Sequence, residues 1–176
     1  MSSNSAASGN VSFASGDANS GNSGSVVIQS GASTGANSGS ISISTGDGNR
    51  AGTISLSAGL STETGGAVRL VGGSSSSNIG GAIDIASGVG VSESGSISIK
   101  TFSTDAASGS IGLVTGDSIS GTSGSVKLAT GSGSTSGSIT LSVGTSTTSS
   151  GSDISIQAGY SDSMTGGKVL LTSGNG

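Results

Sequence analysis

The chain has 176 residues, of which 35 are glycine, with a net charge of −4 and only 8% charged residues. It contains no histidine, cysteine, proline or tryptophan, which excludes disulfides, thiolate metal sites and histidine-based catalysis. Five lysines and arginines are too few for a nucleic-acid-binding patch, and 30% hydrophobic residues with so little charge differ from the composition of disordered chains.

Residues 1–7 precede the first repeat and are predicted to form an N-terminal tail on a single repeat domain that spans residues 8–176. The first ten residues, MSSNSAASGN, lack the charged and apolar regions of a signal peptide. No later run approaches the roughly 20 apolar residues of a membrane-spanning helix. We therefore expect no membrane insertion.

Twelve repeat units follow, and their first residues are 13 to 15 positions apart. Position 2 of a unit is glycine in all units but one, where Ser152 stands, and position 9 is glycine in all but one, where Phe102 stands. Such fixed columns are typical of a repeat architecture. The units span residues 8–22, 23–37, 38–50, 51–64, 65–79, 80–93, 94–107, 108–122, 123–135, 136–150, 151–165 and 166–176.

Two further columns hold large apolar side chains in every unit. Position 4 is Val11, Val26, Ile41, Ile54, Val68, Ile83, Ile97, Ile111, Val126, Ile139, Ile154 and Val169. Position 6 is Phe13, Ile28, Ile43, Leu56, Leu70, Ile85, Ile99, Leu113, Leu128, Leu141, Ile156 and Leu171. The residues at positions 3, 5 and 7 are mostly polar, and this alternation predicts one half-buried β-strand per unit. The flanking glycines supply positive φ or permit close backbone approach.

The consensus x-G-x-Φ-x-Φ-x-S/T-G predicts an all-β fold, namely a parallel β-solenoid of about twelve repeats, because one strand buries too little apolar surface to stand alone. In a coil of one unit, positions 11 and 13 face inward, and they are mostly small, as in Ser33, Gly35, Ser75 and Ser77. The alternative is a coil of two units, in which the aliphatic rows of opposite sheets meet.

Serine and threonine occupy most of the predicted outward strand positions, so a regular hydroxyl surface is expected. The candidate surface residues are Ser40, Ser42, Ser44, Thr53, Ser55, Ser57, Ser138, Thr140 and Ser142. With this pattern over nearly all twelve units, the chain resembles the Ser/Gly-rich short-repeat β-solenoids of surface and adhesin-like proteins. It also resembles the flat ice-binding solenoids, although serine outnumbers threonine and charges such as Arg69 and Asp84 interrupt the surface.

The first resemblance implies a structural or adhesive module, a stiff rod or fibre segment at the cell surface or outside the cell. The second implies, as the alternative, an ice-binding protein whose ranks of hydroxyls order water. The ends of the predicted stack lack caps, so homo-assembly end to end or side to side is expected. Ice or another surface is the remaining partner, and nucleic acid is excluded.

No catalytic, cofactor or metal site is predicted. Gly31-Ala-Ser-Thr-Gly35 matches the nucleophile-elbow string, but that motif requires a histidine base that the chain lacks. Asp17, Asp47 and Asp117 follow a position-9 glycine, and an aspartate there is typical of a turn. The alternative, a calcium-binding solenoid, would need an aspartate in nearly every unit. The chain is therefore predicted not to be an enzyme.

Overall fold

The computed structural model describes residues 7–175, and this range contains neither an α-helix nor a β-strand. The predicted all-β class is therefore wrong, and so is the parallel β-solenoid in both its one-unit and its two-unit form. Of the predicted tail, residues 1–6 lie outside the described residues. The chain divides into two compact units, Met1–Ala86 and Ser87–Gly176, and each is described by itself.

The solenoid is absent because backbone hydrogen bonds do not run from one predicted strand to the next. The described residues form three backbone–backbone hydrogen bonds, donated by the N–H groups of Gly81, Gly95 and Gly167. Each bond joins residues only seven or eight positions apart, across a loop of the chain. A stack of strands needs such bonds along its whole length, so the extended segments remain separate.

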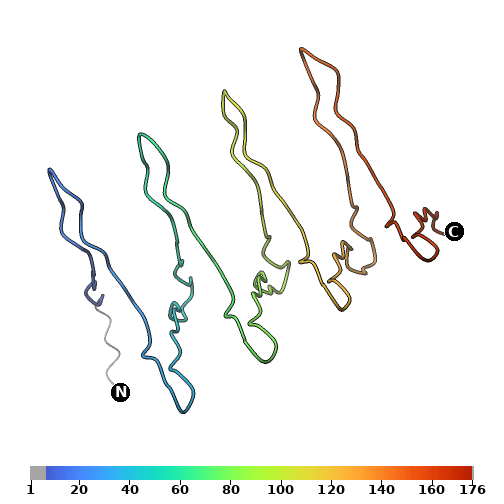
Figure 1. The fold of residues 1–176 in the computed structure, drawn as a ribbon. Helices are drawn as coiled ribbons and strands as arrows, with labels where there is room; N and C mark the ends of the chain where they lie inside the picture. The colour runs from blue at the N-terminus through green and yellow to red at the C-terminus, as the bar shows by residue number, and fades with distance from the viewer. Residues whose placement is uncertain (1–6, 176) are drawn as a thin grey trace. The chain divides into compact units, whose positions relative to one another are not determined.

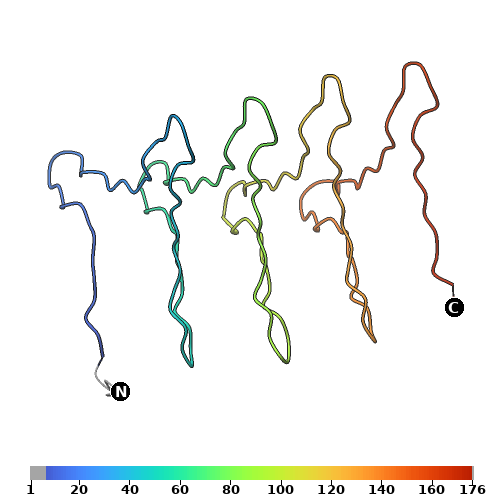
Figure 2. The same cartoon turned by 90° about the horizontal axis from the view of Figure 1, so that it is seen from below.

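In place of strands and tight corners, the described chain makes one bend in each of the first eleven repeat units. The bends lie at residues 19–21, 34–36, 48–50, 62–64, 76–78, 91–92, 105–106, 119–121, 134–135, 147–149 and 162–164. Each bend is the tip of a narrow excursion with two facing arms (Figures 1 and 2). We call the place where the two arms come together the neck.

The excursions of each compact unit repeat in direction. Within residues 7–86, the excursions that bend at 19–21 and 62–64 point the same way, and so do those that bend at 34–36 and 76–78 (Figure 1). Within residues 87–175, the same relation holds between the bends at 105–106 and 147–149. Excursions of like direction are therefore three repeat units apart.

The described residues contain no buried side chain. The accessible surface is 17818 Å², whereas a folded monomer of 16.1 kDa is expected to expose about 7,400 Å² and its unfolded chain about 23,000 Å². The single chain thus removes about a quarter of its unfolded surface from water, far below the roughly 70% of an ordinary domain. A conventional hydrophobic core is missing.

Candidate interaction surface

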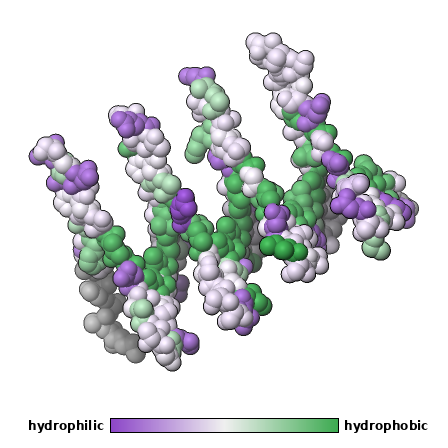
Figure 3. Space-filling view, in the orientation of Figure 1, coloured by the Kyte–Doolittle hydropathy of each residue, from purple (hydrophilic) through white to green (hydrophobic). Residues whose placement is uncertain are grey.

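The apolar side chains at positions 4 and 6 of all units, which we call the apolar ladder, are exposed. The position-4 side chains are 48–81% exposed and the position-6 side chains 65–86%. In every unit the position-4 residue is the less exposed of the pair, as in Ile41 at 51% and Ile43 at 69%. Most of the hydrophobic surface lies at the bases of the excursions, and their tips are more polar (Figure 3). The prediction that the ladder forms a closed core is therefore wrong for the single chain.

Nine necks bring the position-2 glycine of one unit against the position-8 side chain of the preceding unit. A methyl group placed on these glycines would lie 3.0–3.6 Å from the position-8 side chain. The pairs are Gly24 with Ser15, Gly39 with Ser30, Gly52 with Thr45, Gly66 with Ala58, Gly95 with Ser87, Gly109 with Thr101, Gly124 with Thr115, Gly137 with Thr130 and Gly167 with Ala158. Small residues at both positions thus let the two arms approach.

Three necks are also closed by a hydrogen bond. The N–H of Gly81 donates to the carbonyl of Gly73 at 2.8 Å, and equivalent bonds of 2.9 Å join Gly95 to Gly88 and Gly167 to Gly159. In each case a position-2 N–H meets a position-9 carbonyl. None of the described glycines has a positive φ, so close approach, and not a left-handed backbone, explains the position-2 column.

The backbone of position 9 takes part in the necks, but the side-chain direction of its glycines is open. Eleven units carry glycine there, and a methyl group placed on any of these residues would meet nothing within 4 Å. The twelfth unit carries Phe102, whose ring is 81% exposed, and Lys100 Nζ lies 5.7 Å from the ring centroid. The single chain therefore accepts even a large side chain at position 9.

Serine and threonine at position 11 stabilise the bends. Their hydroxyl oxygens accept hydrogen bonds of 2.9–3.4 Å from backbone N–H groups two or three residues further along. These residues are Ser33, Ser61, Ser75, Thr104, Ser118, Ser146 and Ser161. The expectation that position 11 faces an interior is wrong, because these side chains bond the bend instead.

Every third unit has a different kind of bend. Position 11 is glycine in the units that begin at residues 38, 80 and 123, at Gly48, Gly90 and Gly133. A methyl group there would approach the carbonyl oxygen of Arg50, Glu93 or Thr135, at 3.5 Å in the first case and 3.1 Å in the third. From the second unit to the eleventh, two hydroxyl bends thus alternate with one glycine bend, a pattern of three units or 42–43 residues.

The least exposed residues recur at the same interval of three repeat units. Only Gly72, Thr115, Ala158 and Ser161 are half-buried among the described residues. The first three occupy position 8 of the units that begin at residues 65, 108 and 151, and they are 43 residues apart. Sequence reasoning missed this triplet period, although the glycines at position 11 mark it.

The predicted surface ranks are exposed. Ser40, Ser42, Ser44, Thr53, Ser55, Ser57, Ser138, Thr140 and Ser142 all face solvent. None of these nine hydroxyls takes part in the hydrogen bonds of the described chain. The apolar residues between them are exposed as well, so both kinds of side chain in these segments face solvent.

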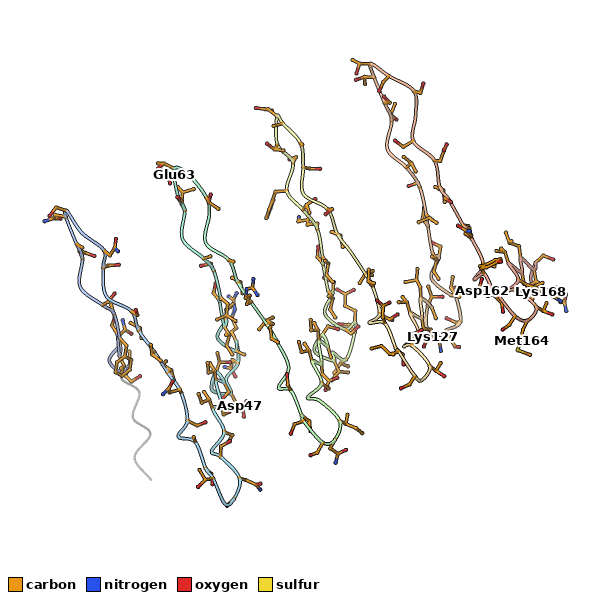
Figure 4. The ribbon with its side chains drawn as sticks, viewed as in Figure 1. Asp47, Glu63, Lys127, Asp162, Met164 and Lys168 are labelled. Atoms are coloured by element: carbon orange, nitrogen blue, oxygen red, sulfur yellow. The ribbon has the colours of Figure 1, made fainter. Side chains whose placement is uncertain are left out.

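The described residues offer no enclosed site. They contain no pocket, no group of three acidic residues able to hold a metal ion and no helix able to span a membrane. The charged side chains are dispersed: Glu63 lies at the tip of its excursion, far from Asp47 in the same compact unit (Figure 4). The groups that the described residues expose to a partner are therefore the apolar ladder, the hydroxyls and the unpaired backbone N–H and C=O groups.

Comparison of the chain with protein-family models, with curated proteins and with solved structures found no match.

Proposed function

We propose that the chain is a structural, adhesive repeat module that acts by associating with further copies of itself. The observation that carries this proposal is the exposure of the whole apolar ladder at 48–86% per side chain. Monomeric soluble proteins rarely leave so much contiguous apolar surface in water. A partner that covers the ladder supplies the burial that the single chain lacks.

Repetition explains how weak elements give a stable contact. Burying the two ladder side chains of one unit is worth about 3–6 kcal/mol, at about 1.5–3 kcal/mol for each side chain. Association costs about 4–15 kcal/mol of lost translational and rotational freedom. About one to five units are therefore enough to offset the cost of association, and the chain offers twelve. The exposed hydroxyls remain available for further contacts.

The backbone supports the same conclusion. Only three backbone–backbone hydrogen bonds form in the described chain, so most N–H and C=O groups of the extended segments lack an intrachain partner. Extended segments with free backbone groups are templates for pairing with another chain. Side-chain and backbone groups of each unit thus favour the same kind of partner.

The test is sedimentation velocity over a wide range of protein concentration, combined with negative-stain microscopy. We expect particles that grow with concentration and shrink on dilution. A chain that stays monomeric at the highest concentration contradicts the proposal. Thermal hysteresis and ice shaping are measured on the same samples, and activity from a strictly monomeric chain favours the ice-binding alternative.

A further inference from the structure

We propose that copies of this chain associate by placing the acidic tip of an excursion of one copy against a basic ladder segment of another. We call positions 3–7 of a repeat unit its ladder segment, and a bend with the two residues on either side of it a tip. This inference rests on the proposed self-association and identifies the two surfaces that meet.

The charged residues divide between these two surfaces by sign. The ladder segments carry four basic and two acidic residues, whereas the tips carry seven acidic residues and one basic residue, Arg50. The basic ladder residues are Arg69, Lys100, Lys127 and Lys168. The acidic tip residues are Asp17, Asp47, Glu63, Glu93, Asp105, Asp117 and Asp162. All of them are exposed. A tip and a basic ladder segment of two copies therefore attract each other, whereas two tips repel.

Each surface also carries exposed apolar side chains. Four of the acidic tips contain large apolar side chains that are 83–111% exposed, namely Leu60, Val89, Val91, Ile119, Tyr160 and Met164. On the other surface, Arg69 and Lys127 occupy position 5, between ladder side chains that are 57–76% exposed. A tip and a basic ladder segment thus bury apolar area and pair opposite charges in the same contact.

The charged groups of both surfaces are available to a partner. None of the acidic or basic side chains takes part in the hydrogen bonds of the described residues. Lys100 has a contact within the chain, because its Nζ lies 5.7 Å from the ring centroid of Phe102. An exposed ion pair adds little affinity but selects which surfaces meet, so the apolar side chains supply most of the attraction.

Contact between a tip and a ladder segment has a consequence for the form of the assembly. The two surfaces differ, so the contact is heterologous, and each copy that binds still offers its own tips and ladder segments. Heterologous contacts that do not close into a ring give open, growing assemblies. The inference therefore accounts for a fibre that lengthens with concentration.

The experiment reverses two charges on each surface. The ladder variant carries Arg69→Glu and Lys127→Glu, and the tip variant carries Glu63→Lys and Glu93→Lys. Each pair has one site in each compact unit, and Glu63 lies at the tip of its excursion (Figure 4). Sedimentation velocity compares the wild type, the two variants and an equimolar mixture of the variants over the same concentrations.

We expect each variant alone to associate about tenfold more weakly than the wild type, because attraction becomes repulsion at the reversed sites. The mixture should associate more strongly than either variant, because the basic tips of one variant meet the acidic ladder segments of the other. Loss of structure in a variant would not be recovered by mixing, so recovery identifies the contact itself.

Net charge alone predicts a different result. Starting from −4, the tip variant becomes neutral, and neutrality by itself promotes association. A tip variant that associates as strongly as the wild type, or a mixture that associates no better than its components, overturns the contact between tip and ladder and leaves self-association intact. A wild-type chain that stays monomeric overturns the proposed function itself.

Two single substitutions provide the matched control. Lys127→Glu and Arg50→Glu make the chain more negative by the same amount, but Lys127 lies in a ladder segment and Arg50 lies in a bend. We expect Lys127→Glu to weaken association by about threefold and Arg50→Glu to leave it unchanged. Equal weakening by both substitutions counts against the inference, because it assigns the effect to net charge.

Discussion

The neck between the units that begin at residues 65 and 80 allows neighbouring glycines to be compared. A methyl group on Gly72 would collide with the carbonyl oxygen of Gly81, whereas one on Gly73 would meet nothing within 4 Å. The N–H of Gly81 donates to the carbonyl of Gly73 at 2.8 Å. Gly72→Ala should therefore open this neck, and Gly73→Ala should leave it closed.

The magnitude follows from the hydrogen bond. To admit the methyl group of Gly72→Ala, the two arms must separate by about 1 Å to reach an ordinary nonbonded distance of about 3.5 Å. The N···O distance between Gly81 and Gly73 then exceeds the range of about 2.7–3.2 Å for a hydrogen bond. Loss of one such bond costs about 0.5–1.5 kcal/mol, which corresponds to about two- to twelvefold faster amide exchange at Gly81.

The measurement is amide hydrogen exchange at Gly81, followed by NMR in dilute solution where association is absent. Gly73→Ala is the matched control, since it adds the same methyl group one residue away and removes the same backbone entropy of glycine. Equal exchange rates for Gly81 in the two variants would show that the facing arm of the neck leaves room for a side chain at residue 72. The reasoning about necks would then fail.

Two further predictions concern the bends. Ser118→Ala removes the hydroxyl that accepts from the N–H of Gly121 at 3.0 Å, so we expect a local loss of about 0.5–1.5 kcal/mol, seen as faster amide exchange at Gly121 and recovered in Ser118→Thr. Gly90→Ala places a methyl group against the carbonyl oxygen of Glu93, so chemical shifts over residues 90–93 should change, whereas Gly112→Ala, with open space around it, should alter only its immediate neighbours. A Gly90→Ala spectrum as mild as that of Gly112→Ala would contradict the tight glycine bend.

The sequence allows the repeat units and their columns to be located, but it does not determine how the units meet. Alternation such as Val-Ser-Phe at residues 11–13 indicates an extended segment with one apolar side. It does not say whether the group that covers that side comes from the next unit or from another molecule. The β-solenoid prediction assumed the next unit, and the absence of strands in residues 7–175 shows that assumption to be wrong.

The glycines of the repeat have three kinds of surroundings in the structure. Gly66 is confined by the facing arm, Gly48 approaches its own bend, and Gly46 has open space around it. Because glycine has no side chain, the residue type alone does not indicate which of these surroundings it has. Sequence reasoning missed the triplet of serine or threonine and glycine at position 11, because it compared successive units and not every third unit.

The serine and glycine content has one physical consequence that links the necks to association. Small residues at positions 2 and 8 let the two arms of an excursion meet without burying the ladder side chains, as at Gly24 and Ser15. Larger residues there would themselves form apolar contacts inside the chain and compete with those between chains. The neck at Val143 and Ser152 has a large residue at position 8 and serine in place of glycine at position 2, and Val143, at 45%, is the least exposed of the large apolar side chains. Small necks therefore leave the ladder side chains exposed, which is the arrangement that the proposed self-association requires.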